Sequence, residues 1–310
     1  MFVTANHIAN FSLFKRTYQP GIFWQGVGNN YSHNAVENGP HNCVLGGGNE
    51  DWPTGQGQPQ AGSGSQNLFD SNTLDSCVYE CGDCGAFYSC GQQGTAWTSR
   101  GNVLKNSTFR NIGSWTMCAT IHAGLLDHFH PKGGGRWSIF CPSALLSSEA
   151  QLTCLAASLT PRYLDDQMSG WLIEGSTIDG AAKGLLLGGG RRNRVIGNHF
   201  ANVVGPAIDL DDRGLGWQLN DCKGTGPTSL SGRVKALLYP GSPWPKQYPE
   251  LLNITTDAAC APAYCEVVGN RYDASTVKNF LSGASPSSWP SWHVVVKDNT
   301  KTVPAAAQHE

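Results

Sequence analysis

A short pattern of apolar and polar positions recurs along the chain. It consists of an apolar residue, two further residues, Asn or Ser, one more residue, and a second apolar residue, as in Tyr31 to Val36 with Asn34 at the polar position. The pattern occurs six times, beginning at Tyr31, Phe69, Leu104, Ile173, Val195 and Val267. Each copy is too short for a helix and places a polar turn between two apolar positions. It therefore predicts short strands joined by turns.

The spacing of these copies predicts a solenoid. Ile178 and Phe200 end neighbouring copies and lie 22 residues apart. In a second register, Leu-Asp-Asp, Leu-Gly-Gly and Leu-Asp-Asp begin 23 residues apart, at Leu164, Leu187 and Leu210. No coil of this length buries its apolar side alone, so stacked coils share a core and their Asn side chains can form a ladder at equivalent turns. Leucine-rich repeats have a similar period, but their LxxLxLxxN template is absent from this chain.

The composition of the chain argues against several other classes of protein. Charged residues make up 14% of the 310 residues, against about 25% in an average domain, and the chain has 38 Gly and 21 Asn. Helical bundles and coiled coils need more Ala, Glu, Lys and Leu. The ten Trp argue against disorder, and a net charge of −2 gives no electrostatic basis for binding nucleic acid. No apolar run reaches the length of a membrane span.

Two stretches interrupt the repeat. Residues 51–66 are rich in Gly, Pro and Gln and are expected to project as a loop. Phe109 and Ile178 end consecutive copies but lie 69 residues apart, and the excess of 47 over one 22-residue coil maps to residues 115–161. This segment contains neither Asn nor the pattern. We interpret it as a foreign or disordered insert, such as a retained intron translated in frame, with a lobe folded over the groove as the alternative.

Several segments resemble a known superfamily. They are GPHNCVLGGGNE (39–50), GDCGAFYSCGQQ (82–93), RYLDDQMSGW (162–171), LLLGGGRRNRVIGNHF (185–200) and AIDLDDRGLGW (207–217). The chain resembles the pectate-lyase-like superfamily, including β-helix domain proteins of unassigned activity. The resemblance implies an all-β fold, a single-stranded right-handed parallel β-helix with 22–23-residue coils, long loop insertions and an exposed groove. We expect one such domain over residues 1–300 and a tail over 301–310.

Three Asp side chains are predicted to share the outer face of this solenoid. Side chains alternate along a strand, so Asp165 and Asp211 point outward if the preceding leucines point inward, and Asp209 faces the same way as Asp211. The backbones of Asp165 and Asp211 should lie roughly 9–10 Å apart, with Gly188 between them leaving a depression. Inverting glycosidases use carboxyl groups about 6.5–9.5 Å apart, and like charges this close raise at least one pKa.

Basic and aromatic residues near these strands complete the predicted site. The substrate-binding candidates are Arg191, Arg192, Arg213, Trp171, Trp217, His41 and Glu50. The three Arg side chains suit acidic sugars, and each Trp follows an Asp by six residues and suits stacking on a sugar ring. The alternatives are structural: ion pairs for the Arg side chains, coil-corner packing for the Trp side chains, turn hydrogen bonds for the Asp pairs, and core packing for His41.

The function predicted from these residues is a carbohydrate-active protein that acts on a polysaccharide, as a glycoside hydrolase or a lyase. Asp165 and Asp211 would share the acid and base roles, and Asp209 would assist them or bind a cation, for which Ca²⁺ is the best suited. Polygalacturonase-like hydrolases carry an Asp pair, Gly-His-Gly and Arg-x-Lys. This chain has Asp pairs and Arg233-Val-Lys235 but no Gly-His-Gly. The alternative function is a non-catalytic, glycan-binding or surface scaffold, and we expect a monomer in either case.

Eleven Cys and four glycosylation sequons bear on redox state and location. Cys81 and Cys84 form a CxxC, a spacing that binds zinc or performs redox chemistry, but buried thiols or a local disulfide are favoured because no second CxxC follows. A His cluster near Cys118 lies within residues 115–161. No metal ligand is assigned from either group. We expect an extracellular or cell-surface protein whose N-terminal signal is missing from this chain, with a cytoplasmic protein as the alternative.

Overall fold

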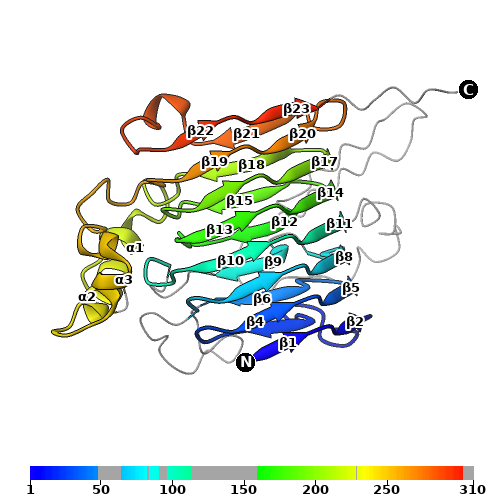
Figure 1. The fold of residues 1–310 in the computed structure, drawn as a ribbon, viewed down its shortest axis with the longest axis horizontal. Coiled ribbons are helices and arrows are strands. Elements are labelled where there is room, and N and C mark those ends of the chain that lie inside the picture. The colour runs from blue at the N-terminus through cyan, green and yellow to red at the C-terminus, as the bar shows by residue number, and fades with distance from the viewer. Residues whose placement is uncertain (48–63, 82–83, 91–95, 114–158, 228, 303–310) are drawn as a thin grey trace, which may run out of the picture.

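The computed structural model describes residues 1–47, 64–81, 84–90, 96–113, 159–227 and 229–302 of the chain. These residues form a predominantly β structure of three sheets, in which the strands of each sheet follow one another along the molecule from β1 to β23 (Figure 1). The strands of all three sheets pair in parallel, as in the neighbouring pairs β12 with β15 and β15 with β18.

Each sheet takes every third strand of the chain. Sheet A contains β1 (Phe2–Thr4), β4 (Asn30–Ser32), β7 (Leu68–Asp70), β10 (Asn102–Lys105), β13 (Trp171–Glu174), β16 (Arg194–Ile196), β19 (Glu266–Val268) and β22 (Val295–Lys297). Sheet B contains β2 (His7–Ala9), β5 (Ala35–Gly39), β8 (Thr73–Cys77), β11 (Thr108–Ile112), β14 (Thr177–Ala181), β17 (His199–Val203), β20 (Arg271–Asp273) and β23 (Thr300–Thr302). Sheet C contains β3 (Ile22–Trp24), β6 (Val44–Gly47), β9 (Cys84–Cys90), β12 (Leu159–Leu164), β15 (Leu185–Gly188), β18 (Pro206–Asp211) and β21 (Asn279–Gly283). This order is compatible with a β-helix or another solenoid.

The recurring sequence pattern spans the turn from sheet A to sheet B. Its polar positions form a continuous ladder in which each backbone N–H donates to the side-chain oxygen one coil further on, over 2.9–3.1 Å. The ladder residues are Asn6, Asn34, Asn72, Ser107, Ser176, Asn198, Asn270 and Asn299. The residue before each one has a left-handed φ of 50–66°, for which the chain uses Gly175, Gly197 and Gly269 in three coils. The predicted Asn ladder is thus confirmed.

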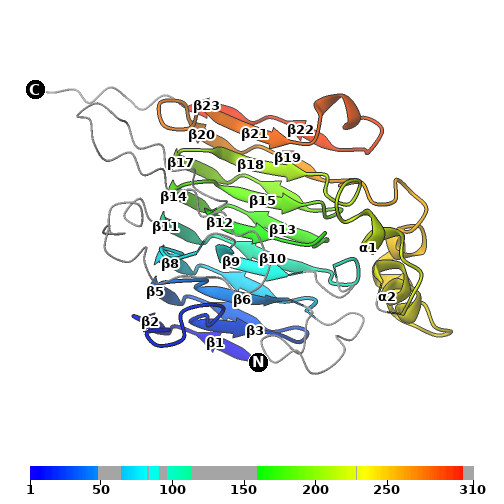
Figure 2. The same cartoon turned by 180° about the vertical axis from the view of Figure 1, so that it is seen from behind.

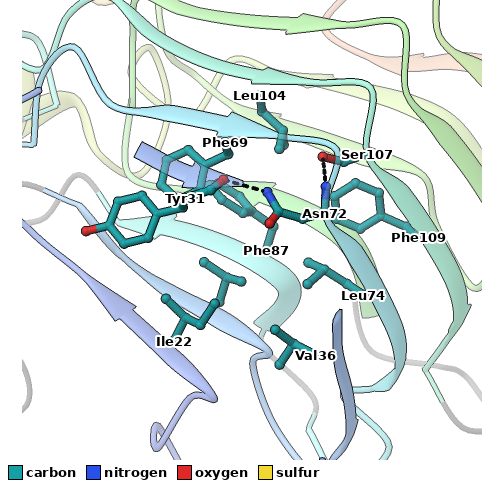
Figure 3. Close-up of a pocket in the computed structure, with 11 residues that line it drawn as sticks. Ile22, Tyr31, Val36, Phe69, Asn72, Leu74, Phe87, Leu104, Ser107 and Phe109 are labelled. Atoms are coloured by element: carbon teal, nitrogen blue, oxygen red, sulfur yellow. Dashed lines mark hydrogen bonds between the residues drawn. The ribbon is translucent and has the colours of Figure 1, made fainter. Parts of the chain in front are cut away.

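The apolar positions of the pattern point into a core enclosed by the three sheets. Tyr31, Phe69 and Trp171 lie in sheet A and meet Phe87 of sheet C and Trp24 at the end of β3, with ring centroids 4.8–6.4 Å apart. Figure 3 shows part of this core, where Asn72 Nδ2 donates to the carbonyl oxygen of Tyr31 over 2.8 Å. The pocket drawn there is lined by core side chains, and none of the three predicted Asp residues is among them.

A helical excursion leaves the stack between β18 and β19 and lies to one side of it (Figure 2). It contains α1 (Leu219–Lys223), α2 (Leu230–Leu237), α3 (Trp244–Gln247) and η2 (Pro249–Leu252). The Cys222–Cys260 disulfide closes it. Buried Arg100 contacts Glu250 over 3.3 Å, so the excursion is fixed to the coils by an ion pair from the stack. Further along the chain, η3 (Pro286–Ser288) precedes β22.

Within residues 240–252, α3 and η2 each have a Pro at the start, which suits the first turn of a helix. The predicted insert 115–161 ends too late, because residues 159–161 belong to β12, whose Leu159 pairs with Cys84. The rest of that insert, and most of the predicted loop 51–66, lie outside the described residues.

Candidate functional site

The leucines that set the second sequence register align in sheet C as expected. Leu164, Leu187 and Leu210 are register partners on successive strands, and all three are buried in the core. Asp165 directly follows β12 and Asp211 ends β18, with Gly188 of β15 paired with Asp211. The alternation along these strands therefore directs the two Asp side chains to the outer face.

The guanidinium of Arg213 joins the two carboxylates. Its Nη1 donates to Oδ1 of Asp165, and its Nη2 and Nε donate to Oδ2 of Asp211 over 2.8 and 3.1 Å. The backbone N–H of Arg213 also donates to Asp211 Oδ1 over 2.5 Å. We call Asp165, Arg213 and Asp211 the Asp–Arg cluster.

Gly188 makes room for this arrangement. A Cβ at Gly188 would lie 3.1 Å from Cζ of Arg213 and 2.7 Å from the carbonyl oxygen of Leu164. Any larger residue would therefore displace the guanidinium. The prediction of an open depression over Gly188 is therefore wrong, because the Arg213 side chain fills that space. The charge of two nearby Asp residues attracts the guanidinium to that position.

Asp165 is the more buried carboxyl of the cluster. It is 7% exposed, and the hydroxyl of Tyr88 donates to its Oδ2. Burial, and after it the charge of the neighbouring Asp166, raise the pKa of Asp165 to about 6, although Arg213 and the Tyr88 hydrogen bond oppose the change. Asp165 is therefore a carboxyl that holds its proton at mildly acidic pH.

Asp166 and Asp209 have separate contacts. Gln218 Nε2 donates to Asp166, which places the start of α1 beside the cluster. Asp209 accepts a hydrogen bond of 2.9 Å from the Ser282 hydroxyl and lies 3.8 Å from Nζ of Lys183. Asp209 shares the face of Asp211 on β18, but its contacts are with Ser282 and Lys183 rather than with Arg213.

Trp217 is the exposed aromatic side chain at this site. It is 72% exposed, and Cζ of Arg213 lies 5.3 Å from the centroid of its ring. A cation at this distance is attracted to the ring face. The contact orients an aromatic surface next to the Asp–Arg cluster.

Other predicted substrate-binding residues are placed elsewhere. Trp171 is 1% exposed and packs among core aromatic rings, so its assignment to sugar stacking is wrong. Arg191 is also 1% exposed and donates to the carbonyl oxygens of Asp257 and Ala258, over 2.7 Å to the latter, so it anchors the helical excursion rather than a ligand. Arg192 lies over the Tyr264 ring at 4.3 Å.

The N-terminal candidates do not join the Asp–Arg cluster. His41 is buried, donates a hydrogen bond from Nδ1 to Oδ1 of Asn42, and lies 3.0 Å from Sγ of Cys81. His41 therefore lies beside the CxxC and not in the Asp–Arg cluster, which corrects its assignment to substrate binding. Glu50 lies outside the described residues.

Neither of the two candidate metal groups fits a cation in this structure. Arg213 already occupies the oxygens of Asp165 and Asp211 that Ca²⁺ would need, and its charge would repel the cation. His41, Cys81 and Cys84 have donor atoms within 4.8 Å of one another. The two sulfurs form a disulfide, however, and a disulfide has no thiolate to bind zinc.

Three residues that contact the candidate site are not among those assigned to it from the sequence: Tyr88, Lys183 and Ser282. Ser282 is the register partner of Asp209, but 73 residues separate them because the helical excursion interrupts the period. Tyr88 lies on β9, one strand before β12 in sheet C. Only the strand order could have revealed these contacts.

Comparisons with known protein families, curated proteins and solved structures found no match to this chain. Among the residues that the structure describes, no helix is both long and apolar enough to cross a membrane.

Proposed function

We propose that this protein is a right-handed parallel β-helix, related to the pectate-lyase-like superfamily, that hydrolyses a polysaccharide at the Asp–Arg cluster. The observation that carries the proposal is the juxtaposition of a buried, protonatable Asp165, a second carboxylate at Asp211 and an exposed Trp217 around one guanidinium. The three parallel sheets and the Asn ladder support the β-helix.

Asp165 is the proposed general acid. A pKa of about 6 keeps much of this carboxyl protonated at mildly acidic pH, which is the property needed to protonate the departing glycosidic oxygen. Asp211, whose side chain is 27% exposed and is bound to Arg213, is the proposed general base that takes a proton from the attacking water. In this step the glycosidic C–O bond breaks, the water oxygen bonds to the anomeric carbon, and each carboxyl exchanges one proton.

The surrounding residues suit an acidic polysaccharide. Arg213 and Lys183 place two positive charges on the outer face of sheet C, where they can pair with uronate carboxylates. A substrate carboxylate that binds Arg213 would draw the guanidinium away from Asp165 and free the acid for catalysis. Trp217 offers its exposed ring for stacking on a neighbouring sugar. Asp209, which contacts Lys183 and Ser282, would assist by orienting the water or a sugar hydroxyl.

The proposal includes an extracellular or cell-surface location and a monomeric state. The disulfides Cys43–Cys77 and Cys222–Cys260 support the location, because such bonds form and persist in oxidising compartments. The proposed partner is a glycan.

A screen of acidic and neutral polysaccharides tests the function. Reducing ends and unsaturated products should be measured together, because hydrolysis yields the former without the latter. We expect Asp165→Asn and Asp211→Asn each to lower the rate by about 10²–10⁴-fold. Asp221→Asn, an exposed Asp on α1, is the matched control and should retain full activity. Unchanged activity in Asp211→Asn would refute the site assignment, and unsaturated products would replace the hydrolase with a lyase.

A non-catalytic glycan-binding protein is the second candidate. It is favoured by one observation: both oxygens of Asp165 already have donors, Tyr88 and Arg213, which stabilises a static cluster. This function predicts that no polysaccharide is cleaved, whereas glycan binding persists in Asp165→Asn and is lost in Trp217→Ala. Binding is measured by calorimetry with the same polysaccharides.

A further inference from the structure

The CxxC that the sequence singled out lies beside a histidine. Cys81 and Cys84 form a disulfide, and Nε2 of His41 lies 3.0 Å from Sγ of Cys81. The backbone N–H of Val78 donates to the carbonyl oxygen of His41 over 3.0 Å, which ties the chain leading to Cys81 to the residue that contacts it. The Cys43–Cys77 disulfide reinforces the same connection.

The hydrogen-bond network assigns the tautomer of His41. Asn42 donates from Nδ2 to the carbonyl oxygen of Gly85 over 2.8 Å, so its Oδ1 faces Nδ1 of His41 at 2.5 Å. Because that oxygen only accepts, Nδ1 must carry the proton. In the neutral ring, Nε2 therefore presents a lone pair to Cys81, the position from which an imidazole acts as a proton acceptor.

The two sulfurs differ in access. Cys84 is fully buried at the start of β9, whereas Cys81 is only partly buried. An incoming thiol can therefore reach Cys81 but not Cys84. The loop closed by this disulfide is also short, with a separation of 3 residues against 34 and 38 for Cys43–Cys77 and Cys222–Cys260. A disulfide that closes a short loop restricts the unfolded chain least, so opening it costs the fold least.

We propose that His41, Cys81 and Cys84 form a thiol–disulfide exchange site for low-molecular-weight or peptide thiols. The incoming thiol loses its proton to Nε2 of His41, and its sulfur attacks Sγ of Cys81. The Cys81–Cys84 bond breaks, Cys84 leaves with the electron pair, and His41 returns the proton to it. A second thiol then attacks the substrate sulfur of the mixed disulfide and releases Cys81 beside His41.

The complete reaction balances. Two substrate thiols are oxidised to one disulfide, and the Cys81–Cys84 disulfide is reduced to two thiols. An external disulfide, such as oxidised glutathione, regenerates the site by the reverse steps. This site is independent of the Asp–Arg cluster, so the outcome of one test does not decide the other.

The first test uses the unmodified full chain. The protein is equilibrated in glutathione buffers of increasing reducing strength, its free thiols are alkylated, and each Cys is identified by mass spectrometry. We expect Cys81 and Cys84 to be alkylated first, under conditions that leave Cys43–Cys77 and Cys222–Cys260 intact. If Cys81–Cys84 opens only with or after Cys222–Cys260, the proposal is overturned.

The second test measures turnover of a fluorescent dithiol peptide with oxidised glutathione. Cys81→Ala should abolish the catalysed rate, and His41→Gln should lower it by about 10²-fold because Gln cannot accept the proton. The double variant Cys222→Ala/Cys260→Ala lacks a disulfide for which no histidine contact is found among the described residues, and it should retain the full rate. A wild-type rate equal to that of Cys81→Ala would reject the exchange site. Zinc bound to these Cys in the non-reduced protein would also reject it, since the sulfurs would then be thiolates.

Discussion

Two polar arrays cross the coils of this protein, one at the turn from sheet A to sheet B and the other at the end of sheet C. The first is the Asn/Ser ladder, in which neutral side chains repeat the same hydrogen bond over 2.9–3.1 Å from coil to coil. The second is the Asp–Arg cluster, in which two carboxylates from non-adjacent strands meet one guanidinium. Both arrays are largely buried.

The difference between them lies in charge and repetition. In the ladder every buried N–H finds an oxygen of the next coil, so each residue stabilises its neighbours and carries no charge that titrates. The cluster occurs at one place and holds a carboxyl whose pKa burial raises to about 6. Regular neutral polar groups are typical of a scaffold, whereas an irregular and perturbed ionic group is the better candidate for chemistry.

The largest effect is expected from breaking the ladder at its centre. Asn198 is fully buried, accepts from the N–H of Ser176 over 3.1 Å, and donates to the carbonyl of Ile173 over 3.0 Å. Asn198→Leu leaves both groups without these partners, and each buried unsatisfied group costs about 1–3 kcal/mol. We expect the free energy of unfolding, measured by denaturant titration, to fall by about 3–5 kcal/mol.

Asn198→Ser is the matched control, because Ser occupies the same ladder position at Ser107 and Ser176. Its hydroxyl can still accept from the coil below, so we expect a loss of only about 1 kcal/mol. Equal stability losses in the Leu and Ser variants would show that the ladder hydrogen bonds contribute nothing beyond side-chain volume.

The sequence predicted this scaffold because each coil repeats the same physical requirement. Every coil needs two inward apolar residues and one Asn or Ser at the turn, so the requirement recurs as a visible pattern, for example at Asn34, Asn198 and Asn270. The alignment of Leu164 with Leu210 followed from the same reasoning. The register of β18 with β21, which lies beyond the helical excursion in sheet C, was harder to place, because no constant period spans the excursion.

The site was less predictable because identical spacing led to different environments. Trp171 follows Asp165, and Trp217 follows Asp211, by six residues. After Asp165 the chain enters β13, so Trp171 is buried in the core. After Asp211 the chain turns into the helical excursion, so Trp217 stays outside. The local sequence does not contain that change of direction, and the burial of Arg191 by the excursion was unpredictable for the same reason.

An intermediate effect is expected from titrating the cluster. The folded-state pKa of Asp165, about 6, lies above the value of about 3.9 for an unfolded chain. The folded protein therefore binds more protons between these values, and its free energy of unfolding should decrease as pH rises from about 4 to about 6. The loss attributable to Asp165 is on the order of 2 kcal/mol.

Comparison with Asp165→Asn isolates this contribution. The variant cannot ionise, so the difference between its unfolding free energy and that of the wild type should change across pH 4–6. The corresponding difference for Asn198→Ser should stay constant, because an amide does not titrate in this range. A wild-type and Asp165→Asn difference that is also constant with pH would contradict the perturbed carboxyl and would make the two arrays alike.

The smallest effect on stability is expected at Trp217. Its side chain is largely exposed and its described contact is with Arg213, so Trp217→Ala should change the free energy of unfolding by less than about 0.5 kcal/mol. The same variant should weaken glycan binding by about tenfold, which corresponds to about 1.4 kcal/mol, because the stacking surface is removed.

Trp171→Phe is the comparison at the matched offset: it should lower stability and leave glycan affinity unchanged, because Trp171 belongs to the core. Calorimetric titration and thermal unfolding measure both quantities in each variant. If Trp217→Ala binds glycan as tightly as the wild type, then the irregular array lacks the sugar platform assigned to it, and its contacts serve the scaffold in the same way as those of the ladder.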